Sequence, residues 1–428
     1  MTTHTFTLFF VFFLVATLFA RIGLSVRQIR HVSMHRDRVP EQFSADISLA
    51  AHQKAADYTV AKRRFAILLM LLNAFTLLCF TLFGGLQFLS GILLGLTASP
   101  FVYQMSLLAA VAFISGLISL PFDYYAQFGL EAEFGFNRMS RPLFFMDLLK
   151  GTLVGAIIGL PLASLVLVLM EKTGNLWWVC AWFAWIGFQV LALVLFPTVL
   201  APLFNRFTPL EDEALREQVE KLLERTGFVS KGLFVMDGSK RSSHSNAYFT
   251  GFGASKRIVF YDTLISRLSA NEIEAVLAHE LGHFRLRHIT KRMAVMGGLS
   301  LVFLALLGYL RSQDWFYLGL GVTPSADMPN DAMALLLFAL VMPLFTFFLA
   351  PLVSFSSRRH EFEADAFAAQ HASAHDLASS LVRLYEDNAS TLTPDPLYSA
   401  FHDSHPPAPV RISRLVGDSG KKTEERAD

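Results

Sequence analysis

Seven long apolar stretches dominate the hydrophobic pattern of this chain. They occupy residues 6–26, 65–86, 105–122, 148–170, 177–200, 293–310 and 333–355. Each is long enough for an α-helix to cross the apolar core of a bilayer, which is about 30 Å thick. The pattern therefore predicts a mainly α, polytopic membrane protein with seven transmembrane helices. A cleaved signal peptide is the alternative for the first stretch, but basic residues follow it instead of preceding it, which favours a retained helix.

The distribution of basic residues predicts the orientation of these helices. Eight of them separate the first two stretches: Arg27, Arg30, Arg36, Arg38, Lys54, Lys62, Arg63 and Arg64. Because cytoplasmic loops are enriched in Lys and Arg, we expect this segment in the cytoplasm and the N-terminus outside. Counting seven spans from there places residues 201–292 and the tail after residue 355 in the cytoplasm as well.

The segment between the fifth and sixth stretches has the pattern of a small water-soluble unit. An amphipathic helix is expected at 211–227, strands at 232–236, 246–250 and 258–261, and a glycine turn at 251–253. We therefore divide the chain into helices 1–5 (1–200), a catalytic unit (201–292), helices 6 and 7 (293–355) and a tail (356–428). The end of the tail, residues 417–428, is charged and is expected to be disordered.

The most informative motif is His-Glu-Leu-Gly-His at 279–283, an H-E-x-x-H sequence. A helix without proline is expected from 271 to 288, started by a capping box of Ser269 and Glu272. Residues four apart share a helix face, so His279 and His283 are placed to bind one tetrahedral zinc ion. Glu280 lies beside them and is the candidate base for the attacking water.

A catalytic zinc ion needs a third protein ligand. The metzincin solution is excluded because Leu286 and Ile289 occupy the positions where that class has Gly and His. Glu361 and Asp365 share the face of a later helix, so Glu361 is the candidate third ligand and Asp365 the group that orients a ligand histidine. Glu363 points elsewhere on that helix. Acidic helix faces are often only solvated, so the assignment depends on the H-E-x-x-H motif.

Composition agrees with a membrane protein and excludes some partners. Hydrophobic residues make up 53% and charged residues 17% of the chain, and the mean hydropathy is +0.45. The net charge of +1 gives no reason to expect a nucleic-acid partner. The two cysteines, Cys79 and Cys180, lie in apolar stretches and are expected to be neither disulfide-bonded nor zinc ligands.

The ordered motifs of this chain resemble those of the CAAX prenyl protease 1 family, integral-membrane zinc endopeptidases that cleave beside a prenylated cysteine. The motifs that carry the resemblance are HQKAA at 52–56 within the segment 30–62, FGFN at 134–137, PLFNRF at 202–207, NAYF at 246–249, HELGH at 279–283, SRR at 357–359 with EFEAD at 361–365, and HPP at 405–407. They extend over nearly the whole chain.

The resemblance implies a barrel of seven transmembrane helices around a water-filled chamber, with one zinc ion near its cytoplasmic end. It implies that His279, His283 and Glu361 bind zinc, that Glu280 is the base and that Asp365 supports the ligands. It also implies the roles of four further residues. Asn246 and Ala247 would hold the peptide substrate, and His405 and Arg411 would lie near the scissile carbonyl.

Two features point away from a eukaryotic member of that family. The segment 311–332 is short and the sequence ends without an ER-retrieval signal, so we expect a bacterial cytoplasmic-membrane homologue. A heat-shock-type quality-control protease that acts on misfolded membrane proteins or signal-type peptides is the alternative function. An intramembrane protease is disfavoured by the charged residues around the motif, and a transporter by the few polar residues within the spans.

Overall fold

The computed structural model describes residues 1–230, 232–250 and 257–424. The glycine turn predicted at 251–253 lies outside the described residues. Within these described residues, seven helical segments are long and apolar enough to cross a membrane, as predicted: Thr3–Met34, Leu49–Phe80, Pro100–Glu133, Arg141–Lys172, Gly174–Phe204, His288–Leu310 and Asp331–His371. They contain helices α1 (Thr3–Met34), α2 (Leu49–Phe80), α4 (Pro100–Tyr125), α6 (Arg141–Lys172), α7 (Trp177–Leu195), α12 (His288–Leu310), and α14 (Asp331–Thr346) with α15 (Ala350–His371).

Several helices extend well beyond the stretches that hydropathy marks. The second stretch was expected at 65–86, but α2 begins at Leu49, where Ser48 caps it by accepting a hydrogen bond from the Ala51 amide, and ends at Phe80. Backbone hydrogen bonding continues past the apolar stretch, so hydropathy marks the part within the membrane and misses the rest of the helix. After α2, Gly84 takes a left-handed conformation (φ 78°) and a short apolar helix, α3 (Gly85–Leu96), follows.

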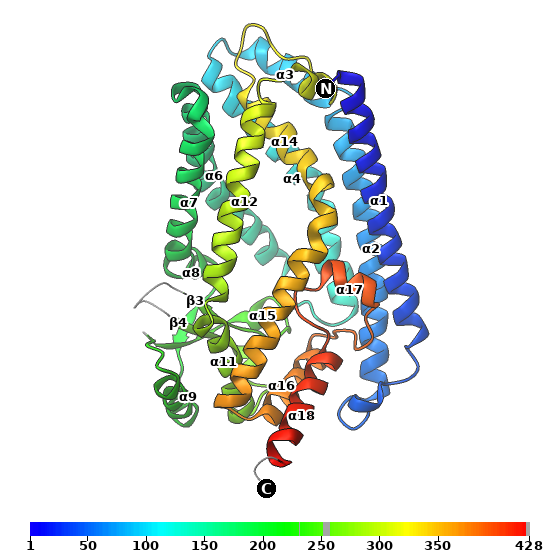
Figure 1. Ribbon diagram of the computed structural model, residues 1–428, viewed down its shortest axis with the longest axis vertical. Helices are drawn as coiled ribbons and strands as arrows, with labels where there is room; N and C mark the ends of the chain where they lie inside the picture. Colours follow the sequence, from blue (N-terminus) through cyan, green and yellow to red (C-terminus); the bar gives the residue numbers. More distant parts are fainter. Residues whose placement is uncertain (231, 251–256, 425–428) are drawn as a thin grey trace.

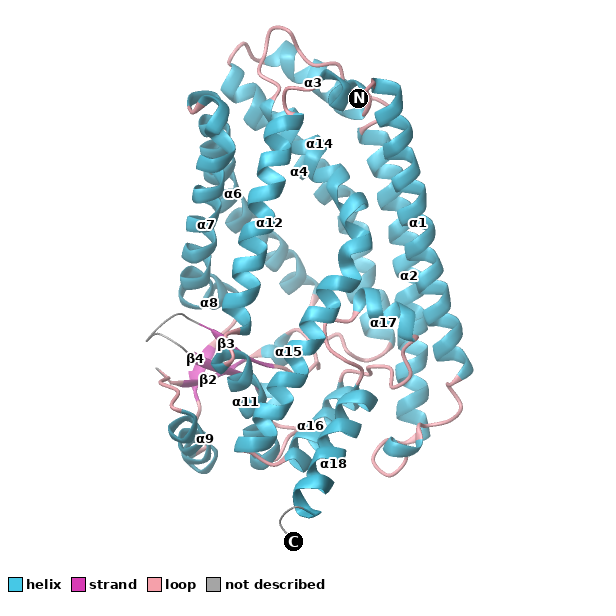
Figure 2. Cartoon of the chain, viewed as in Figure 1, coloured by secondary structure: helices cyan, strands magenta, loops and turns pink. Residues whose placement is uncertain are grey.

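The spans form a wall that is one helix thick. In the most apolar 18-residue part of Gly174–Phe204, only 6% is buried inside the protein. In the corresponding part of Leu49–Phe80, 11% is buried. A helix in a solid bundle would bury one whole face, so most of both faces of these helices is accessible. Figures 1 and 2 show the spans standing along the long axis of the molecule, with the sheet and the C-terminal helices gathered at one end. This arrangement agrees with the predicted barrel of transmembrane helices.

The unit between the fifth and sixth spans contains a four-stranded sheet in the order β1-β2-β4-β3. The predicted strands are β2 (Leu233–Met236), β3 (Ala247–Thr250) and β4 (Arg257–Tyr261), and the predicted helix is α9 (Glu213–Thr226). The sequence pattern missed β1 (Phe207–Pro209), which has three residues and ends in proline. Strand β3 lies at the opposite edge of the sheet and pairs only with β4 among the described strands.

Two predicted elements differ from the structure. The helix expected at 271–288 is broken: α11 (Ala270–Arg285) ends before Arg287, which has a left-handed φ of 57°, and α12 starts at His288. Part of the tail expected to be disordered at 417–428 belongs to a helix, α18 (Ala408–Glu424), and the rest of it, residues 425–428, lies outside the described residues. Its buried Ile412 and Leu415 join a core cluster that includes residues of β4, α9, α11 and α16 (Ala374–Asp387), which fixes the first part of α18, before residue 417, on the catalytic unit.

Helices α11 and α15 pack against one another unusually closely. A Cβ atom added at Gly282 would lie 3.0 Å from the Cα of Ala364 and 3.1 Å from the Cβ of Phe367. Any larger residue at this position would have to push α15 away. The glycine inside the H-E-x-x-H motif therefore sets the distance between the two helices that carry the candidate metal ligands.

We predict that Gly282→Ala destabilises the protein by about 1–3 kcal/mol, because overpacking outweighs the gain in helix propensity. The melting temperature and the zinc content of the purified protein measure this effect. The control is Gly298→Ala in α12, where an added Cβ would meet nothing within 4 Å. A Gly282→Ala protein with the melting temperature and metal content of the parent would contradict the role given to this contact.

Candidate active site

Helix α11 presents His279 and His283 on one face because its start and its apolar face are both fixed. The predicted capping box is present: the Ser269 side chain accepts from the amide of Glu272, and the Glu272 carboxylate accepts from the amide of Ser269 at 2.8 Å. Apolar side chains of α11, among them Leu277 and Leu281, are buried in the core cluster of the unit. The helix cannot rotate without exposing them, so the direction of the two imidazoles is set.

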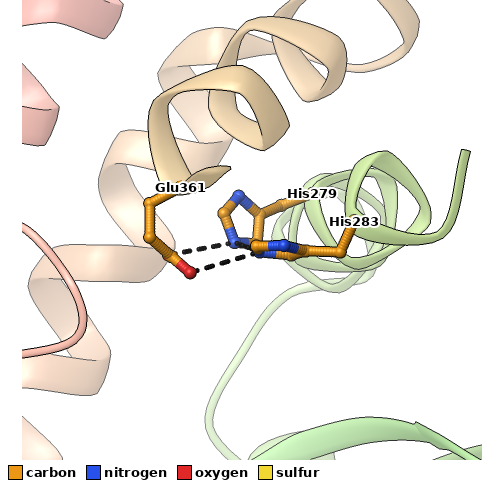
Figure 3. A group of neighbouring side chains, drawn as sticks. All are labelled: His279, His283 and Glu361. Carbon is orange, nitrogen blue, oxygen red and sulfur yellow. Dashed lines mark hydrogen bonds and ion pairs between the residues drawn. The ribbon is translucent and has the colours of Figure 1, made fainter. Parts of the chain in front are cut away.

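Helix α15 brings Glu361 to the same point, as Figure 3 shows. The Nε2 atoms of His279 and His283 lie 3.2 Å apart. The carboxylate oxygens of Glu361 lie 3.5 Å from the first of these nitrogens and 3.3 Å from the second. All three side chains are buried or half-buried.

These distances fit a tetrahedral zinc ion. With ligand bonds of about 2.0–2.1 Å, two corners of a tetrahedron are about 3.3–3.4 Å apart. Two imidazole nitrogens and one carboxylate oxygen are also the donor types that zinc prefers in catalytic sites, where a fourth position stays open. The predicted ligand set is therefore brought together with suitable spacing and chemistry.

Asp365 lies behind His279, one turn after Glu361 on α15. Its Oδ1 atom is 2.8 Å from Nδ1 of His279. The imidazole can donate to this carboxylate, which leaves its Nε2 lone pair free for a metal. Burial favours the neutral imidazole, but the hydrogen bonds to Asp365 and Glu361 raise the pKa of His279 above its usual value. A proton and a metal ion therefore compete for this side chain.

Arg411 comes from α18 and supports Asp365. Its guanidinium donates to both carboxylate oxygens, at 2.9 Å from Nε and 2.6 Å from the terminal nitrogen. Burial by itself would lower the pKa of Arg411, but the hydrogen bonds to the Asp365 carboxylate outweigh burial and raise this pKa above its usual value. Arg411 therefore stays charged. Tyr385 of α16 holds the start of α18 in place by accepting a hydrogen bond from the Ala408 amide. Two of the three guanidinium nitrogens of Arg411 bond to Asp365. Arg411 is therefore placed to hold the carboxylate that contacts His279.

Glu280 and His405 lie on the accessible side of the cluster. Glu280 is half-buried, and its side chain has no hydrogen bond or ion pair to any residue that the structure describes. His405 precedes α18, its side chain is 64% exposed, and its Nδ1 atom lies 2.7 Å from Oε2 of Glu361. The structure thus brings His405 to the ligand cluster from a segment 44 residues away in the sequence.

Asn246 and Ala247 lie at the edge strand of the sheet. The carbonyl of Asn246 accepts from the Tyr261 amide of β4 at 3.0 Å. Because backbone groups alternate along a strand, the N–H of Ala247 faces the free edge. There it donates to the side chain of Asn246 at 2.8 Å.

The sequence pattern did not identify His288 as part of the candidate site, and Glu363 was not expected among the candidate ligands. His288 is buried and its Nδ1 atom lies 3.0 Å from Nδ1 of the candidate ligand His283. Glu363 points away from the ligand cluster, as predicted, but toward His288, at 3.0 Å. No local signal reveals this contact, because position i+5 on a continuous helix is about 140° from position i.

Comparison with known proteins adds independent information. Residues 28–206 match the family described as CAAX prenyl protease N-terminal, five membrane helices, and residues 209–418 match peptidase family M48. Metallopeptidases of family M48 are in general zinc-dependent. The chain is 40% identical to a CAAX prenyl protease 1 homolog of Arabidopsis thaliana over 76% of this chain and 75% of the relative. It is 34% identical to CAAX prenyl protease 1 of Saccharomyces cerevisiae over 93% and 92%.

A solved structure agrees with these relationships. The crystal structure of Ste24p from S. mikatae superposes with a TM-score of 0.90 at 32% sequence identity, over 96% of this chain and 99% of that protein. These similarities support the CAAX protease assignment and not the quality-control alternative. The chain belongs to the CAAX prenyl protease 1 family and is an integral-membrane zinc metalloprotease.

Proposed function

We propose that this protein binds one zinc ion and cleaves peptides beside a prenylated cysteine near their C-terminus. The observation that carries the zinc assignment is the convergence of His279, His283 and Glu361 at the spacing of a tetrahedral site. The substrate class comes from the relatives, which are named CAAX prenyl protease 1. The division of the chain into helices 1–200, a catalytic unit 201–292, helices 293–355 and a tail 356–428 is part of the same proposal.

Each residue of the cluster has a separate task in the proposed reaction. When bound by His279, His283 and Glu361, zinc supplies Lewis-acid chemistry that polarises the scissile carbonyl and lowers the pKa of the attacking water. Glu280 takes the proton of that water and passes it to the leaving amine. No covalent intermediate is needed.

The remaining residues hold and complement this machinery. Asp365 fixes the tautomer of His279, and Arg411 fixes Asp365, so both are positioning residues. His405 stands on the exposed side, and there it is placed to donate a hydrogen bond to the developing oxyanion. The sequence analysis expected both His405 and Arg411 near the scissile carbonyl, and this proposal gives that place to His405 alone.

We further propose that the edge strand β3 holds the substrate. An extended peptide pairs with a free strand edge through backbone hydrogen bonds, and Ala247 directs its N–H to that edge. The side chain of Asn246 occupies this N–H in the substrate-free protein. Substrate binding would exchange that local hydrogen bond for one to the peptide.

The catalytic unit is proposed to face the cytoplasm. The basic turn between α1 and α2 and the catalytic unit lie at the same end of the molecule (Figure 1), and basic segments favour the cytoplasmic side. The bacterial cytoplasmic membrane expected from the sequence stays a prediction.

The proposed function is tested with two peptides of one sequence, farnesylated and unmodified. We predict cleavage beside the farnesylated cysteine with kcat/KM at least about tenfold higher, because burying two CH2 groups is already worth that much. Mass spectrometry of the products gives the cleaved bond.

Glu280→Gln should retain zinc and lose roughly 10²–10⁴-fold in kcat. Glu361→Ala should lose zinc, whereas Glu386→Ala, an exposed carboxylate on α16, should keep it.

Two results would contradict these assignments. Equal cleavage of both peptides would remove the prenyl group from the substrate description while leaving the zinc protease intact. Normal turnover by Glu280→Gln would show that another group is the base.

We predict that Ala247→Pro raises KM or abolishes cleavage while zinc is retained, because proline removes the N–H that faces the free edge of β3. Thermal melting is the control for this change. A parent-like melting temperature with lost cleavage supports the substrate strand. Unchanged cleavage would show that peptides bind elsewhere, and a lowered melting temperature would show that β3 has only a structural role.

Orientation is tested with single cysteines in a chain whose Cys79 and Cys180 are replaced by serine. Ala326 and Lys240 are exposed and belong to segments predicted to lie on opposite sides of the membrane. We predict that a membrane-impermeant thiol reagent added to intact cells labels Ala326→Cys and not Lys240→Cys. The reverse pattern would show that the basic turn does not set the orientation of this protein.

A further inference from the structure

A second histidine stands behind the zinc ligand His283. The Nδ1 atoms of His283 and His288 are 3.0 Å apart. On the other side of its ring, Nε2 of His288 lies 3.0 Å from Oε2 of Glu363. Only 4% of His288 is exposed, so neither of these contacts is replaced by bulk water.

The protonation states along this row follow from the metal site. A ligand histidine binds zinc through an unprotonated Nε2, so the neutral ring of His283 carries its proton on Nδ1. That proton is donated to Nδ1 of His288, which must therefore be unprotonated. The proton of His288 is then on Nε2, where the carboxylate of Glu363 accepts it. With zinc bound to His283, this is the only placement of protons in which each N–H of the row His283, His288 and Glu363 has an acceptor.

We propose that His288 and Glu363 are positioning residues for the zinc ligand His283. They do for His283 what Asp365 does for His279: they hold the proton on Nδ1 and point the Nε2 lone pair at the metal. Both ligand histidines are thus oriented, one directly by a carboxylate and the other by a carboxylate acting through an imidazole. Arg359 holds the outer oxygen of Glu363 at 3.0 Å.

A second metal site is the alternative for this cluster, because His288, His360 and Glu363 bring their ligand atoms within 4.8 Å of one another. The rings of His288 and His360 are stacked, with centroids 4.1 Å apart and planes inclined by 12°. The lone pair of an imidazole nitrogen lies in the plane of its ring. Two nearly parallel rings therefore cannot direct their lone pairs at one ion, and Nδ1 of His288 is already occupied by His283.

The break between α11 and α12 creates this contact. In an unbroken helix His288 would lie about 140° around the axis from His283. Arg287 instead adopts a left-handed conformation, with φ 57°, which is unfavourable for a residue that has a Cβ atom. This turn redirects the chain so that the first residue of α12 faces back onto α11. The left-handed conformation of Arg287 thus places His288 against His283.

Two substitutions at position 288 separate the contacts. Asn places a side-chain oxygen where His has Nδ1, and Gln places its amide where His has Nε2. His288→Asn therefore keeps an acceptor for His283, whereas His288→Gln keeps only the contact with Glu363. We predict that zinc affinity, measured by competition with a chromogenic chelator, falls about 10–100-fold in His288→Gln and less in His288→Asn. At saturating zinc, kcat should fall in the same order with KM unchanged.

The control is His360→Gln, which changes the stacked neighbour of His288 but removes no contact to a ligand. It should bind zinc as tightly as the parent protein, and all three variants should contain one zinc ion per chain. Glu363→Gln, which keeps the size of the side chain but removes its charge, should weaken zinc binding by an intermediate amount. If His288→Asn and His288→Gln bound zinc equally tightly, the proposal would be overturned, whether or not their affinity differed from that of the parent protein. Loss of a second zinc ion in His360→Gln would establish the alternative site.

Discussion

The site depends on the close approach of two helices that are far apart in the sequence. Helix α11 carries His279 and His283, and α15 carries Glu361, so the three ligand atoms meet only if the helix axes come close. Gly282 makes this possible because Ala364 of α15 occupies the space where a side chain would be. The motif therefore contributes more than the proposed ligands and base: the glycine between the histidines is part of the packing that brings in Glu361, the proposed third ligand.

The same approach buries an unusual amount of charge. Glu361, Asp365 and Arg411 are each less than about a tenth exposed, and charges in such surroundings are costly unless they are paired. Arg411 compensates Asp365 with two hydrogen bonds, and a divalent cation would compensate Glu361. This balance explains why α18, at the far end of the chain, must dock on the catalytic unit: without it, Asp365 would lose its main cationic partner.

Both ligand helices are also joined directly to the membrane wall. Only two residues separate the end of α11 from the start of α12, and α15 continues the same span that begins with α14. The active site is therefore fixed at one end of the barrel instead of being carried on a mobile domain. For the proposed prenylated peptides, this position would keep the lipid near the membrane while the peptide backbone reaches the proposed zinc site.

The sequence by itself determined the seven spans, the capped H-E-x-x-H helix and the pairing of Glu361 with Asp365, because hydropathy, capping and helical spacing are local properties. It did not determine where α2 begins or that α18 continues past residue 417, since the hydropathy pattern marks neither. Only the tertiary structure decided that Arg411 anchors Asp365 and that His288 faces His283. The first contact joins residues 46 positions apart. The second requires a left-handed turn at Arg287 that an arginine does not favour by itself, so no reading of local pattern could have found either.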